Sequence, residues 1–96
     1  MPQNETLIIG EFTGTGSSSM LHVNGTITIS VDFSTGPGSG AVKLQRSFDD
    51  GETWKDVETW TDTNFEGIVE EVASYIQYRF NCPTYTSGTI HYVLGA

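Results

Sequence analysis

The chain has 96 residues, of which 36% are hydrophobic and 17% are charged, and twelve acidic against four basic side chains give it a net charge of −8. This length corresponds to one small domain, so we expect residues 1–96 to fold as a single unit. Four cations are too few to form the basic patch that binds nucleic acid or an anionic membrane, so neither is expected as a partner, and a charged partner is expected to be basic.

Alternation of apolar and polar residues with a period of two predicts strands along most of the chain. In chain order, the expected strands are 5–12, 20–23, 26–33, 41–48, 53–61, 65–72, 75–82 and 89–94. Between them, turns are predicted at 34–40, 49–51, 62–64 and 87–88, with the strongest turn composition at 34–40, and Pro83 is expected to end the strand before it. The alternation places one face of each strand in a core.

Seven to eight short strands with a turn every eight to twelve residues predict an all-β fold. We expect a single small antiparallel β-sandwich of the immunoglobulin-like kind, and a small β-barrel is the alternative. Within this one domain, residues 1–24 are a candidate docking arm or edge strand.

Cys82 is the only cysteine, so neither an intrachain disulfide nor a multi-cysteine zinc site is expected. A small domain without disulfides is expected to fold in a reducing cytoplasm. By strand parity the thiol of Cys82 faces the core, where an inert side chain is expected.

One hairpin motif stands out, the string Ser-Phe-Asp-Asp-Gly-Glu-Thr-Trp that starts at Ser47. It matches the Ser-x-Asp-x-Gly-x-Thr-Trp spacing of an Asp-box. Asp49 is expected to accept hydrogen bonds from the turn backbone, Gly51 to adopt a positive φ, and Trp54 to fold back over the hairpin. With Ser47 and Thr53 these residues predict a structural turn and not a catalytic site.

No arrangement of titratable residues predicts catalysis or metal binding. The acidic residues within 49–52 lack the spacing of an EF-hand loop. Glu70 and Glu71 are adjacent on a predicted strand, so their side chains point to opposite faces, and we expect them to form a solvated acidic edge. The two histidines, His22 and His91, accompany no nucleophile motif. We therefore expect a protein that is not an enzyme and has no cofactor and no metal.

Two groups of apolar residues are candidates for binding. The first is a docking strand with Leu7, Ile8, Ile9 and Phe12, since an exposed apolar strand edge marks an interaction site. The alternative is that this segment pairs within its own sheet.

The second group is an exposed aromatic patch of Trp60, Tyr75 and Tyr85, with Phe65 beside it, on which a host glycan could stack. The alternative is that these aromatic side chains belong to the core.

Residues 40–94 resemble a family of small tailed-phage virion proteins. Three segments carry the resemblance: residues 42–57, which read Val-Lys-Leu-Gln-Arg-Ser-Phe-Asp-Asp-Gly-Glu-Thr-Trp-Lys-Asp-Val, together with Tyr78-Arg79-Phe80 and Thr86-Ser87-Gly88-Thr89-Ile90. The resemblance covers a little over half of the chain and leaves out the N-terminal forty residues.

The resemblance implies a structural component of the virion, such as a capsid decoration protein on the outer head surface, and supplies no catalytic residues. The implied partners are the major capsid protein or other virion proteins, and a homo-oligomer such as a trimer is as compatible with the sequence as a monomer. The alternative is a tail or baseplate component, or a carbohydrate-binding module, that contacts the host surface.

Overall fold

The computed structural model describes residues 7–23, 25–71 and 76–95, and within them the fold is all-β and antiparallel, as expected. The strands are β1 (Leu7–Phe12), β2 (Gly16–Ser17), β3 (Leu21–Val23), β4 (Thr26–Ser47), β5 (Lys55–Thr61), β6 (Phe65–Glu70) and β7 (Ile76–Gly95). They form one sheet in the order β1-β7-β4-β5, with β2 and β3 also paired to β7 and β6 paired to β4.

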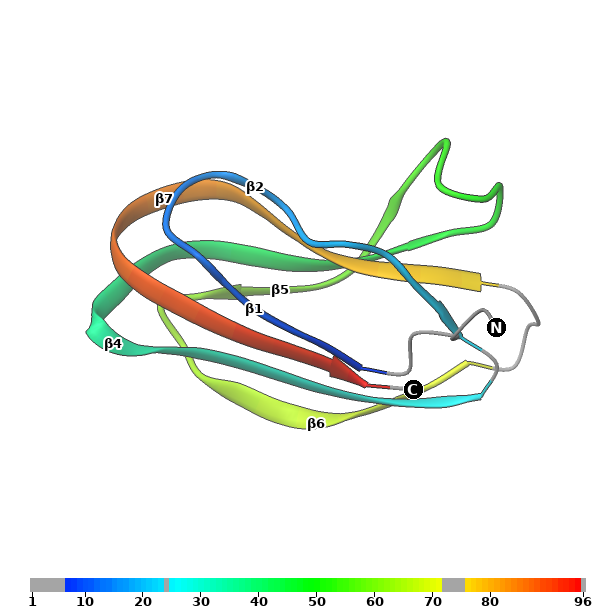
Figure 1. Cartoon of the computed structure of the whole chain (residues 1–96), viewed down its shortest axis with the longest axis horizontal. Helices are drawn as coiled ribbons and strands as arrows, with labels where there is room; N and C mark the ends of the chain where they lie inside the picture. The colour runs from blue at the N-terminus through cyan, green and yellow to red at the C-terminus, as the bar shows by residue number, and fades with distance from the viewer. Residues whose placement is uncertain (1–6, 24, 72–75, 96) are drawn as a thin grey trace, which may run out of the picture.

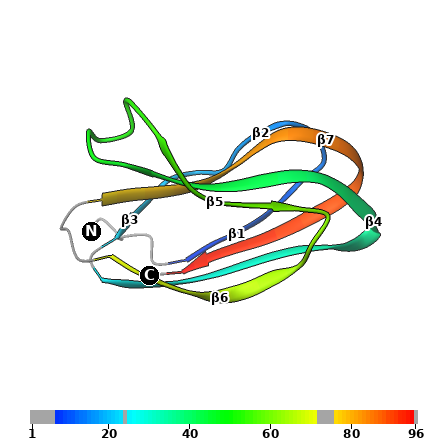
Figure 2. The same cartoon turned by 180° about the vertical axis from the view of Figure 1, so that it is seen from behind.

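This sheet folds over on itself into a two-layered sandwich (Figure 1). The long strands β4 and β7 are antiparallel partners from Thr28 opposite Gly95 to Ser47 opposite Gln77, and both bend near their middle. One layer contains β1, the second half of β7, the first half of β4, and β6; the other contains β2, β3, the first half of β7, the second half of β4, and β5 (Figures 1 and 2).

The bends correct the prediction of turns at 34–40 and 87–88, and of a strand end at Pro83. At these places the chain does not reverse, because pairing between β4 and β7 resumes beyond each register shift. Gly36 and Gly88 both have a φ of 76°, a conformation that suits glycine and bends the strand locally. The predicted strands 26–33 and 41–48 therefore belong to one strand, β4, which ends at Ser47, and residues 76–82 and 89–94 belong to β7.

The core lies between the two layers and follows the predicted alternation. Its residues are Ile8, Phe12, Leu21, Val23, Ile27, Ile29, Val31, Phe33, Val42, Leu44, Trp60, Ile76, Tyr78, Phe80, Cys82, Ile90, Tyr92 and Leu94. Phe80 of one layer packs on Tyr92 of the other with ring centroids 5.4 Å apart. Burying each large apolar side chain contributes about 1.5–3 kcal/mol, so this interlayer packing holds the folded sheet closed.

Candidate docking face

The outer side of the layer that contains β1 and β6 is called here the β1/β6 face. Strand periodicity turns every second residue of this layer away from the core. The outward residues are Leu7, Ile9 and Glu11 of β1, Thr28, Ser30 and Asp32 of β4, Glu66, Ile68 and Glu70 of β6, and His91, Val93 and Gly95 of β7.

Three large aliphatic side chains are exposed on this face. Leu7 is 50% exposed, Ile9 is 68% exposed and Ile68 is 65% exposed. Ile9 lies opposite Val93 on the neighbouring strand, so apolar surface continues from β1 onto β7. Ile68 lies on the opposite edge of the layer, with Gly95 of β7 and Thr28 of β4 between it and Leu7. Single exposed apolar residues are common, and these three are candidates for docking because no described segment covers them.

Acidic side chains border these apolar residues on two sides. Glu11 and Asp32 are paired to either side of His91 at one end of the face, and Glu66 and Glu70 flank Ile68 along β6. Hydrogen bonds from Ser34, and the nearby His91, lower the pKa of Asp32 below its usual value, which keeps it ionised.

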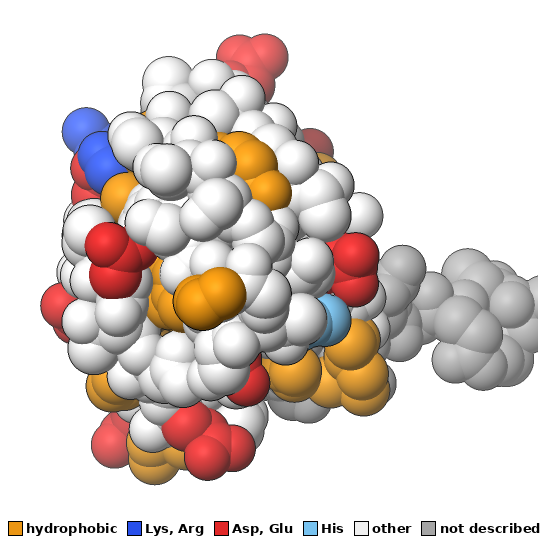
Figure 3. Space-filling model, turned by 90° about the vertical axis from the view of Figure 1, so that its left-hand side faces the viewer, with side chains coloured by type: hydrophobic (Ala, Val, Ile, Leu, Met, Phe, Trp, Pro, Cys, Tyr) orange, Lys and Arg blue, Asp and Glu red, His pale blue; other side chains and the backbone are white. Residues whose placement is uncertain are grey.

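All four Lys and Arg residues of the chain lie in the other layer and its hairpin strands. Lys43 and Arg46 are on the second half of β4, Lys55 is on β5 and Arg79 is on the first half of β7. Figure 3, which views the end where β4 and β7 bend, likewise shows cations gathered on one side and acidic side chains spread around the rest of that end. The β1/β6 face therefore carries acids without a Lys or Arg.

The outer side of the second layer differs because its polar groups satisfy one another. Asp56 accepts hydrogen bonds from Lys43 Nζ and Gln45 Nε2, both at 2.9 Å, and Gln45 Oε1 accepts one from Arg79 Nε at 2.9 Å. The Arg79 guanidinium also lies 4.3 Å from the ring centroid of Trp54. Because these polar side chains already bind one another, this side of the molecule offers fewer free groups to a partner. The β1/β6 face is therefore the better candidate for docking.

The predicted docking strand is β1, and it pairs with β7 within its own sheet, from Leu7 opposite Gly95 to Phe12 opposite Ile90. Ile8 and Phe12 point into the core and are 8% and 5% exposed. Leu7 and Ile9 point outward. The strand therefore pairs within its own sheet, and only its outward side chains remain available for docking.

The predicted aromatic patch is wrong for Trp60, which is 7% exposed and belongs to the core. It faces inward from β5, and its ring stacks on Phe65 with centroids 5.0 Å apart. Tyr85 is half-buried, and its hydroxyl donates to the Gly88 carbonyl. Tyr75 lies outside the described residues, and the described members of the patch form no exposed platform.

The predicted turn at Ser47 has the expected hydrogen bonds. Asp49 Oδ1 accepts from the Thr53 amide at 2.8 Å and from the Ser47 hydroxyl at 2.7 Å, and Ser47 Oγ accepts from the Gly51 amide at 2.8 Å. Gly51 has a φ of 91°. Hydrogen bonds from Thr53, and then from Ser47, lower the pKa of Asp49 to about 2. The turn projects from the sandwich as the loop between β4 and β5 (Figures 1 and 2).

The prediction that Glu70 and Glu71 form a solvated acidic edge is wrong for Glu71, whose carboxylate is buried. The Glu71 side chain is 3% exposed, and its Oε1 accepts from Arg46 Nη1 at 2.9 Å and from Tyr78 Oη at 2.8 Å. Glu70, beside it, is exposed as predicted. No local pattern distinguishes Glu71 from Glu70, because Arg46 lies 25 residues away from Glu71 along the chain.

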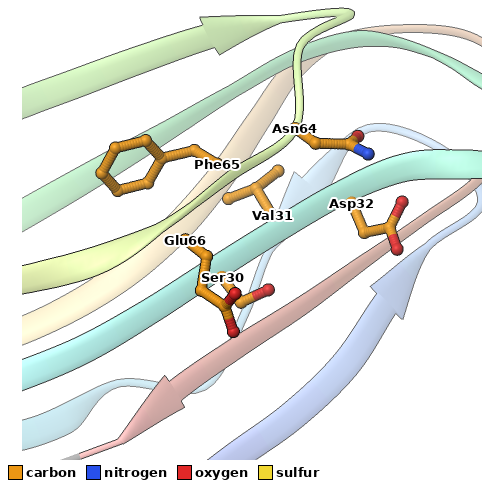
Figure 4. Close-up of a pocket in the computed structure, with 6 residues that line it drawn as sticks. All are labelled: Ser30, Val31, Asp32, Asn64, Phe65 and Glu66. Atoms are coloured by element: carbon orange, nitrogen blue, oxygen red, sulfur yellow. The ribbon is translucent and has the colours of Figure 1, made fainter.

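A shallow depression beside the β1/β6 face is lined by Ser30, Val31, Asp32, Asn64, Phe65 and Glu66 (Figure 4). Asn64 Oδ1 accepts from the Phe33 amide at 2.7 Å, and Asn64 Nδ2 donates to Ser34 Oγ at 2.9 Å. Asp32 Oδ1 accepts from the Ser34 amide at 2.7 Å. These side chains hold β4 where its register shifts.

Within residues 7–23, 25–71 and 76–95, no group of three or more His, Cys, Asp or Glu side chains is placed to hold a metal ion. The described part of the chain also contains no helix long and apolar enough to cross a membrane. No protein-family model matches the chain, and comparisons with curated proteins and with solved structures find no match either.

Proposed function

We propose that this chain is a non-enzymatic structural protein of a tailed-phage particle that docks on the outer surface of the capsid through the β1/β6 face. Its partner is the major capsid protein, and its role is to decorate and reinforce the head. The observation that carries the proposal is the exposure of Leu7, Ile9 and Ile68 on the outer side of one layer, which no described segment covers.

The architecture suits a mechanical role. The outer side of a sheet offers an extended surface to a partner, and the interlayer core behind it resists deformation. One such face is small, so each contact is modest in strength. Many copies on a repeating shell reinforce one another, because the summed contacts become large even where each is weak.

The resemblance to phage virion proteins supports the choice of partner. Its principal segment, residues 42–57, forms the second half of β4, the projecting turn and part of β5, in the layer opposite the docking face. The resemblance therefore concerns strands and a turn of the fold and not the residues of the docking face. The apolar residues of β1 lie outside the segments that carry the resemblance, and only their exposure supports attachment through them.

The copy number of the protein in purified particles tests the proposal. Quantitative mass spectrometry against the major capsid protein is expected to give one copy per capsid subunit or per few subunits. A few dozen copies or fewer would place the protein in the tail, neck or baseplate instead. Its absence from particles would contradict a virion role.

A further inference from the structure

We infer that the surface docking on the β1/β6 face presents apolar side chains bordered by Lys and Arg, and that this surface is not a second copy of the chain. The identity of the partner as a capsid surface rests on the proposed function. The charge and exposure of side chains on the face itself indicate the chemistry of the partner.

The acidic side chains lie on the outer strands of the face, where they would contact the edge of a partner's surface. Glu66 and Glu70 stand on either side of Ile68 on β6, while Glu11 closes the end of β1 beyond Ile9. All three carboxylates are exposed. A partner that covers Ile9 and Ile68 therefore approaches these carboxylates, and cations at the matching positions would attract them and speed association.

Charge also argues against a second copy as the occupant. Two β1/β6 faces brought together would oppose carboxylates with carboxylates, and neither face holds a Lys or Arg to compensate. Three of the chain's four Lys and Arg side chains are moreover already engaged: Lys43 and Arg46 form ion pairs at 2.9 Å with Asp56 and Glu71, and Arg79 covers Trp54. Like-charge juxtaposition selects against self-association through this face.

The arrangement assigns separate roles to the two kinds of side chain. Leu7, Ile9 and Ile68 supply apolar area, which slows dissociation, whereas the carboxylates supply attraction at a distance, which is screened by salt. Binding should therefore weaken as salt is added, chiefly through a slower association rate.

The test measures binding of the full-length protein to DNA-free shells assembled from the major capsid protein of the same phage, by surface plasmon resonance at low and high salt. The border variant is Glu11→Gln/Glu66→Gln/Glu70→Gln. The matched control, Asp50→Asn/Glu52→Gln/Glu58→Gln, also removes three negative charges but changes exposed residues of the projecting turn and β5. Circular dichroism checks that both variants fold.

At low salt the border variant is expected to bind about tenfold more weakly than the unmodified protein and to lose most of the salt dependence, while the control stays within about threefold. Equal weakening of both variants, or binding insensitive to salt and to the border variant, would overturn the inference and leave the proposed function standing. Failure of the unmodified protein to bind shells would overturn both. A dimer in analytical ultracentrifugation that Ile9→Ser disperses would identify a second copy as the occupant and overturn the inference.

Discussion

Arg46 Nη1 lies 2.9 Å from Oε1 of Glu71, joining the end of β4 to the residue that follows β6. Tyr78 Oη donates to the same oxygen at 2.8 Å, so three separate segments meet at one buried carboxylate. Burial is the main cause that raises the pKa of Tyr78, which keeps its hydroxyl protonated as a donor. This junction closes the end of the sandwich away from the bends.

Removing the cation at this junction is expected to destabilise the fold more than neutralising the carboxylate. Arg46→Met leaves a charged Glu71 side chain buried without its guanidinium, which costs about 3 kcal/mol, at the low end for a buried pair because Arg46 is partly exposed. Glu71→Gln retains an oxygen that accepts from Tyr78 and should cost less. Urea unfolding measures both, and the reverse order would contradict the conclusion that the buried carboxylate is the costlier group to leave without its ion-pair partner.

The turn at Ser47 is expected to lose stability in acid through Asp49. The folded pKa of Asp49 is about 2, below the ordinary value of 3.8, because hydrogen bonds from Thr53 and Ser47 favour the carboxylate. Because the pKa of Asp49 is lower in the folded than in the unfolded state, its carboxylate stabilises the fold at any pH above the unfolded-state pKa. That contribution is lost as pH falls from about 4 toward 2. Thermal unfolding of the unmodified protein and of Asp49→Asn should therefore differ at pH 6 and converge near pH 2. A constant difference across this range would rule out the carboxylate as its source.

The bend of β7 against β4 is expected to tolerate no side chain at Gly88. A Cβ there would lie 2.5 Å from the carbonyl oxygen of Pro37, and the φ of 76° disfavours other residues. Gly88→Ala should lower the thermal midpoint strongly, since backbone atoms and not a flexible side chain obstruct the methyl group. The control is Gly14→Ala, where a Cβ meets no atom within 4 Å. Similar midpoints for both variants would show that the two bends do not pack as described.

The thiol of Cys82 is expected to be unreactive in the folded protein. It is fully buried, burial raises its pKa, and its Sγ lies 3.3 Å from the Thr84 carbonyl oxygen. Labelling with a disulfide reagent at pH 8 should proceed only at the rate of unfolding and become rapid in denaturant. Labelling of the native protein as fast as a small-molecule thiol would contradict the buried position.

Local alternation predicted the core well, because strand periodicity is a property of each short segment. Ile27, Ile29 and Val31 are buried as expected, and so are Tyr78 and Phe80. The bends escaped prediction for a physical reason. A Gly- and Pro-rich segment such as 34–40 has the composition of a turn, and only pairing with a strand some fifty residues away keeps it extended.

The candidate site was predicted in part. The apolar character of β1 drew attention to Leu7 and Ile9, but nothing local indicated that Ile68 shares their face, since this depends on β6 pairing with β4 and β4 with β7. The sequence leaves both a surface patch and the core open for Trp60, because it does not say which side of an edge strand faces a second layer. Register across distant strands decides both cases.

Occupancy of the β1/β6 face on assembled particles tests the central claim most directly. Particles lacking the protein are mixed with excess unmodified protein, with Ile9→Ser/Ile68→Ser, or with the control Val57→Ser, which changes an exposed apolar residue on β5 in the other layer. Bound copies per capsid subunit are then counted by mass spectrometry. The account predicts near-stoichiometric binding of the unmodified protein and of Val57→Ser, and loss of most copies of the double variant. Equal occupancy by all three would show that the capsid contact lies elsewhere on the molecule.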